Sequence, residues 1–351
     1  MTIRAGLYLP AVANYTAQRP MMNIDIVIPP FLSDAIFWDN HACMPLHGDA
    51  ECFLPQLERY RRAGVTVVAL NVHFGETPWH EAFATLALFR NWLRRHSDQY
   101  RLIDSVDDVL CAKAAGQVGV FFNLEGGVPV ERHLGFVELF YRLGVRWMLI
   151  AYNKNNRLGG GCQDKDEGLT DYGRQIIDEM ARVGMILCCS HTGYRTAREA
   201  LEYSKNPVIF SHSNPRAVWD HPRNIPDDLI RRCASTGGVI NVNGFGIFLG
   251  PNDISTDAIL KHIDYVVDLV GANHVGLGLD YVFDQQELDV YIGSRPDIFP
   301  PEYGYQRRIA MVEPERIPAI AEALLARGYS EEEVKGILGH NNLRVARQVW
   351  K

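Results

Sequence analysis

The run Met185-Ile186-Leu187-Cys188-Cys189-Ser190-His191 is apolar until it ends abruptly in Ser-His, and Val208-Ile209-Phe210-Ser211-His212 repeats this pattern further along the chain. Near-continuous apolar runs of this length are typical of parallel strands that are buried on both faces. Neutral imidazole is the commonest metal ligand in proteins. His191 and His212, each just past a buried strand, therefore predict one metal site built from separate strand ends.

The same alternation of an apolar, β-rich run with polar residues and then a helical pattern occurs eight times. The candidate strands are residues 36–38, 65–70, 118–122, 147–151, 185–189, 208–210, 239–242 and 275–279. Helical spacing of apolar residues covers 81–96, 170–180, 194–204, 227–235 and 255–270. This alternation predicts an α/β fold, a (β/α)8 TIM barrel. An open doubly wound sheet is the alternative, and it is disfavoured because polar residues follow nearly every strand instead of one crevice.

Two segments stand outside the strand–helix alternation. Residues 1–34 are irregular and contain several prolines, so we expect a short N-terminal extension packed on a barrel that spans 35–351. Residues 284–313 are rich in aromatic residues and proline and are expected to form a long loop or lid. After this segment, residues 317–327, 331–338 and 342–350 are predicted as C-terminal helices.

Composition and charge exclude several classes of function. The chain has 351 residues, 47% of them hydrophobic, and a net charge of −7 without a basic run, which argues against nucleic-acid or membrane partners. No apolar stretch approaches the ~20 residues of a spanning helix, and the N-terminus lacks the pattern of a signal peptide. The seven cysteines are scattered and odd in number, which favours a reducing cytoplasm over a disulfide scaffold.

Polar residues at the predicted strand ends form the candidate site, because TIM barrels carry their chemistry at the C-terminal ends of the strands. These residues are His41, Cys43, His73, Glu125, Tyr152, His191, His212, Asn243 and Asp280. Imidazole and carboxylate ligands suit zinc, so the set predicts one or two divalent metals. Glu125 is placed to bridge two metals, and Asp280 to move a proton during attack of an activated water on a carbonyl. His73 is interpreted as a structural residue.

Several motifs between about residue 36 and the C-terminus resemble those of a known enzyme family. They are Asp39-Asn40-His41, Asn123-Leu124-Glu125-Gly126-Gly127, Gly168-Leu169-Thr170, Ser190-His191, Ser211-His212-Ser213-Asn214, Asp220-His221-Pro222-Arg223-Asn224, Gly276-Leu277-Gly278-Leu279-Asp280 and Gly339-His340-Asn341-Asn342. Together they resemble the membrane (renal) dipeptidase family, which are zinc dipeptidases of the amidohydrolase superfamily. The resemblance implies a metal-dependent hydrolase barrel with two zinc ions, a small-molecule substrate and a homodimer.

The resemblance also implies a role for each matching residue. His41 would ligate one zinc, Glu125 would bridge both, and His191 and His212 would ligate the other. Arg223 would bind the substrate carboxylate, which suits its planar, two-pronged guanidinium. Asp280 would act as the general acid and base of peptide hydrolysis.

The sequence departs from the family pattern at two positions. Cys43 stands where the family has the aspartate of a His-x-Asp motif, and Tyr152 stands where it has a histidine. Thiolate is a good zinc ligand, so we expect Cys43 to replace the aspartate; the alternative is that it does not bind and a single zinc remains. Tyr152 can donate one hydrogen bond to a developing oxyanion in the bound substrate, and the alternative is simple packing at the barrel mouth.

The residues and the resemblance together favour a zinc-dependent hydrolase that cleaves an amide bond in a small carboxylate-bearing substrate, a dipeptide or an N-acyl amino acid. The first alternative keeps the barrel site but catalyses a lyase, isomerase or tautomerase reaction on a specialised metabolite. The second is a barrel that has lost catalysis and serves in binding or assembly. The retained Glu125, His191, His212, Arg223 and Asp280 argue against this last alternative.

Overall fold

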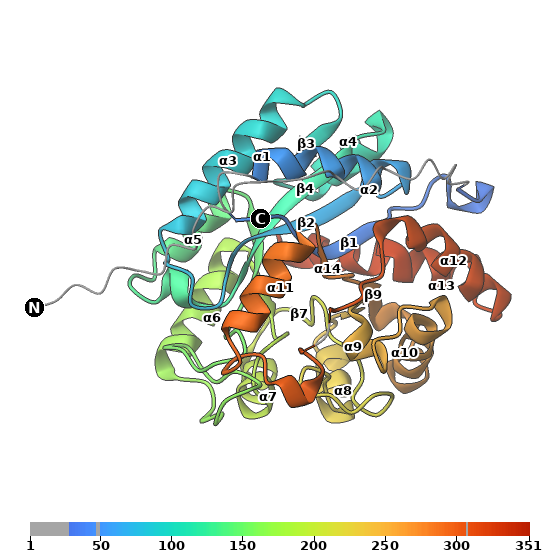
Figure 1. Ribbon diagram of the computed structural model, residues 1–351. Coiled ribbons are helices and arrows are strands. Elements are labelled where there is room, and N and C mark those ends of the chain that lie inside the picture. The colour runs from blue at the N-terminus through green and yellow to red at the C-terminus, as the bar shows by residue number, and fades with distance from the viewer. Residues whose placement is uncertain (1–27, 47–49, 307) are drawn as a thin grey trace, which may run out of the picture.

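The computed structural model describes residues 28–46, 50–306 and 308–351, and its centre is a closed parallel barrel (Figure 1). Eight strands follow one another around it in the order β7-β6-β5-β4-β2-β1-β9-β8. Their bounds are Trp38–Cys43 (β1), Val67–Phe74 (β2), Val118–Glu125 (β4), Val145–Leu149 (β5), Ile186–Cys188 (β6), Val208–Ile209 (β7), Ile240–Val242 (β8) and Val275–Leu277 (β9). A parallel bridge between Phe210 and Ile240 closes the gap from β7 to β8. The predicted (β/α)8 barrel is confirmed.

Helices alternate with the barrel strands and surround them in Figure 1. The longer ones are α3 (Glu81–Arg95), α4 (Val106–Ala115), α5 (Phe136–Arg142), α6 (Asp171–Val183), α7 (Tyr194–Tyr203), α8 (Asp227–Ser235), α10 (Thr256–Val270), α11 (Gln285–Ser294), α12 (Ile317–Ala326) and α14 (Asn341–Val349). Shorter turns are α1 (Ala50–Phe53), α2 (Glu58–Arg62), α9 (Gly246–Leu249), α13 (Glu331–Lys335) and a π-helical turn at Gly336–His340. Single 3₁₀ turns occupy Pro30–Leu32, Leu54–Leu57, Val128–Val130, Ala272–His274, Pro301–Tyr303 and Pro314–Arg316.

Local sequence signals explain where helix α6 begins and ends. The Thr170 hydroxyl accepts the N–H of Gly173, which satisfies one of the free donors of the first turn. Gly184 ends the helix at φ 93°, a left-handed conformation that glycine adopts without steric cost. The predicted helices at 81–96, 194–204, 227–235 and 255–270 are likewise present, with small differences at their ends.

Three barrel strands are longer than the sequence pattern predicts. β1, β2 and β4 continue through the polar residues that were expected to lie just beyond their ends. These buried polar groups are satisfied inside the barrel: Tyr60 donates to Asp39 Oδ2 at 2.8 Å, and Asn71 Nδ2 donates to Glu125 Oε1 at 3.0 Å. Because a paired polar side chain costs little to bury, the strand does not need to stop where the apolar run stops.

Two short strands were not predicted. β3 (Tyr100–Leu102) pairs with the start of β4, and β10 (Tyr281–Val282) pairs with the end of β1 through Ala42 and Cys43. The amide of Phe283 extends this second ladder by donating to Cys43 O at 3.0 Å. β10 therefore joins the loop after β9 directly to the first strand of the barrel.

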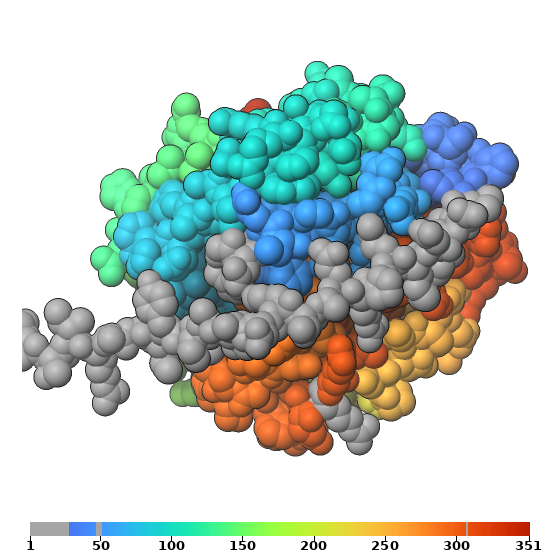
Figure 2. Space-filling view, turned by 45° about the horizontal axis from the view of Figure 1, so that its top comes forward, coloured from blue at the N-terminus to red at the C-terminus, as the bar shows by residue number. Residues whose placement is uncertain are grey.

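The segment that was expected to be a long loop or lid contains helix α11. Asp284 begins this helix by accepting the amides of Gln286 and Glu287, each at 3.0 Å. Tyr291 on α11 contacts Phe74 at the end of β2, with ring centroids 4.9 Å apart. The chain from 284 to 311 also packs on residues that follow β8, so it covers the C-terminal ends of the strands. Figure 2 shows this segment as the orange surface below the blue and teal N-terminal half. We call residues 284–306 and 308–311 the mouth segment.

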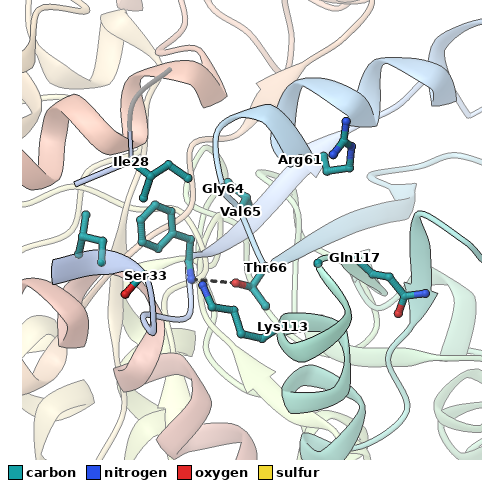
Figure 3. A pocket seen from close by; sticks show the side chains of 11 residues that line it. Ile28, Ser33, Arg61, Gly64, Val65, Thr66, Lys113 and Gln117 are labelled. Atoms are coloured by element: carbon teal, nitrogen blue, oxygen red, sulfur yellow. Dashed lines mark hydrogen bonds between the residues drawn. The ribbon is translucent and has the colours of Figure 1, made fainter. Parts of the chain in front are cut away.

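The opposite end of the barrel holds a separate cavity of about 320 Å³ (Figure 3). It lies next to the starts of β1, β2 and β4, and its lining includes Phe37, Thr66 and Lys113. Most of the expected N-terminal extension, residues 1–27, lies outside the described residues. Within the described residues, the structure has no helix that combines the length and the apolar character needed to cross a membrane.

Candidate metal centre

Three strand ends bring four potential ligands together on one side of the site. His41 Nε2 lies 3.1 Å from Glu125 Oε1 and 3.4 Å from Asp280 Oδ1. Cys43 Sγ lies 3.5 Å from His41 Nε2 and 3.8 Å from Asp280 Oδ1. His41 and Cys43 point from β1, Glu125 ends β4, and Asp280 follows β9. Ligand atoms of His41, Cys43 and Asp280 all lie within 4.8 Å of one another, so one cation can contact them together.

The other oxygen of the same glutamate faces two further histidines. His191 Nε2 is 3.4 Å and His212 Nε2 is 3.6 Å from Glu125 Oε2. The ring of His212 also stacks on that of His41, with centroids 4.2 Å apart. Glu125 thus stands between two groups of ligands, with one carboxylate oxygen toward each.

The protonation of these histidines fits a bound cation. Burial lowers the pKa of His191 to about 3 and that of His212 well below its ordinary value, so both rings are neutral. His191 Nδ1 lies 2.8 Å from Asn153 Oδ1, which can only accept, so a proton on Nδ1 would satisfy this contact and leave the lone pair of Nε2 facing Glu125 Oε2. A lone pair and a carboxylate oxygen repel each other unless a cation lies between them. His212 Nε2 likewise has no hydrogen-bond partner within the described residues. The donor set therefore fits a divalent metal such as zinc.

Burial also controls the acids of the site. Burial alone would raise the pKa of Glu125, but the neighbouring His41 and His191 outweigh it and hold that pKa well below its usual range. Burial raises the pKa of Asp280 to about 6. The pKa of the Cys43 thiol is raised by burial and by the nearby charge of Glu125. A bound cation would reverse this effect and favour the thiolate.

Backbone strain gathers at the same place. Asn153, His191 and Asp280 have φ values of 55°, 60° and 60°, and Asn252 is the only other non-glycine residue with positive φ in the described part of the chain. A left-handed conformation costs about 1 kcal/mol or more outside glycine, and such residues cluster at functional sites. The strain sets the directions in which His191 and Asp280 point.

Arg223 is buried beside the cluster, and no carboxylate of the described residues forms an ion pair with it. Its side chain is only 2% exposed, and Nη2 donates to His212 O at 3.2 Å. Its Nε has no hydrogen-bond partner in the described residues. The guanidinium also lies 5.2 Å from the centre of the Phe248 ring. A buried, partly unpaired cation is costly in an empty site, so this position fits a ligand that brings a carboxylate.

The two remaining candidates have different surroundings. The Tyr152 ring stacks on His191, with centroids 4.1 Å apart, and burial raises its pKa well above the ordinary value, so the hydroxyl keeps its proton. His73 Nε2 pairs with Thr77 O at 2.7 Å, and burial lowers its pKa to about 4. His73 therefore contacts a backbone carbonyl, in keeping with its interpretation as a structural residue.

Three asparagines at the site make hydrogen bonds that could not be predicted from the sequence. Asn71 donates to Glu125, Asn153 accepts from His191, and Asn243 Nδ2 donates to Asp280 Oδ2 at 2.8 Å. Asn243 was identified only as a polar strand end. The available signal was their position near the ends of β2, β5 and β8, but asparagine is also common there for reasons of turn formation.

Comparison with known proteins identifies the family. Residues 52–289 match the sequence profile of the membrane dipeptidases, peptidase family M19. The chain belongs to this family. The matched region includes Glu125, His191, His212, Arg223 and Asp280, and it begins after His41 and Cys43.

Individual membrane dipeptidase relatives and structures agree with this assignment. An uncharacterized dipeptidase of Schizosaccharomyces pombe is 33% identical over 203 residues, which are 55% of this chain and 48% of that protein. Dipeptidase tcpJ of Claviceps purpurea is 28% identical over 274 residues, 77% of this chain and 60% of that protein. The chain thus spans about half to three fifths of these curated relatives. A crystal structure of an amidohydrolase from Pseudomonas aeruginosa has a TM-score of 0.80 at 29% identity, covering 91% of this chain and 98% of that one.

Proposed function

We propose that this chain is a zinc-dependent hydrolase that cleaves the amide bond of a dipeptide or of another small N-acyl amino acid. The observation that supports it most strongly is the placement of Glu125, whose Oε1 lies 3.1 Å from His41 Nε2 and whose Oε2 lies 3.4 Å from His191 Nε2. The buried Arg223 beside this cluster, whose Nε has no hydrogen-bond partner within the described residues, supports a substrate with a free carboxylate.

The proposed ligands divide between two zinc ions. His41 and Cys43 would hold one, His191 and His212 would hold the other, and Glu125 would contact both. Zinc supplies Lewis-acid chemistry at such a site, because it lowers the pKa of a water and polarises a carbonyl. A thiolate at Cys43 would contribute more charge than an imidazole, so the ion that it holds would be the weaker Lewis acid.

The chain's own residues bind the substrate and move the proton. Arg223 pairs with the substrate carboxylate and thereby orients the scissile bond toward the cluster. Asp280 takes a proton from the attacking water and delivers it to the leaving amine, a role that suits a carboxylate placed beside the cluster. Asn243 holds one oxygen of Asp280, which leaves the other free toward the cluster. Tyr152 donates a hydrogen bond from its hydroxyl group to the developing oxyanion.

Metal content and a dipeptide-library assay test this proposal together. We expect two zinc ions per chain, release of free amino acids, and loss of turnover in Asp280→Asn while its metal content is unchanged. Glu125→Gln is expected to lose metal as well as turnover. Full turnover by metal-loaded Asp280→Asn would refute the proposed proton transfer. One metal per chain without hydrolysis would point instead to a lyase, isomerase or tautomerase reaction.

We further propose that the protein is a homodimer in a reducing compartment such as the cytoplasm. All seven cysteines are free, and oxidation of the three buried ones, Cys188 and Cys189 at the end of β6 and Cys233 on α8, would disturb packing. Light scattering coupled to size-exclusion chromatography tests the assembly, with a mass of twice 39.6 kDa as the expected result.

A further inference from the structure

We infer that Asn153 is a positioning residue that fixes the tautomer and the orientation of His191, so that Nε2 is its metal-binding atom. This inference deepens the proposed function and rests on His191 being a ligand. Asn153 is fully buried and adopts a left-handed backbone at φ 55°. Its side chain is aimed at the far edge of the imidazole from Glu125, with Oδ1 2.8 Å from His191 Nδ1.

Two donors converge on the Asn153 oxygen and define its direction. The first is His191 Nδ1 at 2.8 Å, and the second is the thiol of Cys162 at 3.3 Å. An amide oxygen can only accept, so with Oδ1 facing the ring at 2.8 Å the hydrogen bond between them places the shared proton on Nδ1. Nε2, which faces Glu125 Oε2 at 3.4 Å, is then the nitrogen that can offer a lone pair to a metal.

The loop after Asn153 holds the same two residues through the backbone. Cys162 N–H donates to His191 O at 2.9 Å, and Gln163 N–H donates to Asn153 O at 2.8 Å. Gly161 forms an antiparallel bridge with Thr192. A Cβ on Gly161 would lie 2.1 Å from the carbonyl carbon of Asn153, so only glycine allows this close approach. Asn153 and His191 are thus joined both directly and through Cys162.

The face of the ring is fixed by the preceding residue. Tyr152 stacks on His191 at 4.1 Å with an interplanar angle of 21°. Tyr152 restricts tilting of the His191 ring. Asn153 restricts rotation of the ring and determines which ring nitrogen carries the proton. Partners of this kind usually contribute about 10- to 100-fold to metal affinity, because they keep the ligand lone pair on target.

Substitution with glycine tests the oxygen separately from the backbone. Asn153→Gly removes the acceptor but keeps a residue that adopts positive φ without strain. Asn153→Asp keeps an acceptor oxygen at the same place. Asn252→Gly is the matched control, because Asn252 also has positive φ, at 64°, and belongs to the loop after α9 instead of the site.

The first measurement is the His191 tautomer in metal-free protein, read from two-bond ¹H–¹⁵N correlation spectra. We expect an Nδ1–H ring in the wild type, in Asn153→Asp and in Asn252→Gly, and a mixture of tautomers in Asn153→Gly. An Nε2–H ring in the wild type would overturn the inference. This measurement needs only the unaltered protein, so it decides the question even if Asn153→Gly does not fold.

The second measurement is zinc affinity, by competition with a chelator. We expect one of the two zinc ions to bind roughly 10- to 100-fold more weakly in Asn153→Gly, with little change in Asn153→Asp or Asn252→Gly. Equal affinity of Asn153→Gly and the wild type would refute the positioning role. Failure of the wild type to bind zinc would refute the proposed function instead, while the tautomer result would still stand.

Discussion

Replacing Arg223 with methionine gives a direct test of how this site selects its substrate. The Arg223 side chain is 2% exposed, and its Nε has no hydrogen-bond partner within the described residues. A substrate carboxylate would supply that partner. Each hydrogen bond to a charged group contributes about 1.5–3 kcal/mol, and truncating one partner of a buried charge pair costs roughly 2–5 kcal/mol. We therefore expect Arg223→Met to lower kcat/KM for a dipeptide by roughly 10²–10³-fold.

The assay compares a dipeptide with its C-terminal amide, which lacks the negative charge. The wild type should discriminate between the two by about the same factor of 10²–10³, whereas Arg223→Met should hydrolyse both at similarly low rates. Arg223→Lys should fall between them, because lysine keeps the charge without the two-pronged geometry. If Arg223→Met lowered kcat/KM equally for both substrates, the assignment of Arg223 to the carboxylate would be wrong.

A stability measurement separates this effect from misfolding. Arg223→Met loses the hydrogen bond to His212 O, but it also removes a buried charge that is only partly paired. These contributions oppose each other, so we expect the free energy of unfolding without substrate to change by less than about 1 kcal/mol. A much larger loss would mean that Arg223 is mainly a structural residue.

Three further predictions follow from the metal cluster, a buried histidine and a tight backbone contact. Cadmium should produce an ultraviolet thiolate-to-metal charge-transfer band in the wild type that is absent from Cys43→Ser; identical spectra would exclude thiolate ligation. Burial lowers the pKa of His262 from 6.5 to about 4. The neutral, buried ring therefore stabilises the fold fully above pH 6.5, and this stabilisation is lost as pH falls toward 4. Urea unfolding should show that the wild type loses about 2 kcal/mol more than His262→Gln between pH 7 and pH 5, and equal losses would contradict this reasoning. Gly278→Ala places a Cβ 1.9 Å from Ser211 O and should lower the unfolding free energy by roughly 1–3 kcal/mol, whereas Gly293→Ala, with nothing within 4 Å, should not.

The barrel could be predicted because burial of its strands requires a sequence pattern that is easy to recognise. Strands buried on both faces must be apolar along their length, so 185–189 and 208–210 stand out from the amphipathic helices around them. The location of the candidate metal ligands could also be predicted, since the parallel strands of a barrel all present their C-terminal ends on one side. For this reason His41, Glu125, His191, His212 and Asp280 could be expected to converge before any coordinates were known.

What could not be predicted depends on contacts between distant residues. β1 continues through Asp39 because Tyr60 donates to that carboxylate, and no local pattern records this bond. Strands as short as β3 and β10 leave almost no periodic signal. The role of Asn153 is invisible for the same reason, because it depends on a histidine 38 positions away.

The pairing of β10 with β1 has a consequence for motion during turnover. Tyr281 and Val282 are held against Ala42 and Cys43, so the backbone after Asp280 and the strand that carries Cys43 form one rigid unit. The mouth segment begins immediately afterwards, at Asp284. A movement of α11 would therefore hinge beyond this ladder and leave the spacing between Asp280 and Cys43 unchanged. Substitutions that loosen α11 should alter the rates of substrate uptake and product release without altering the geometry of the metal centre.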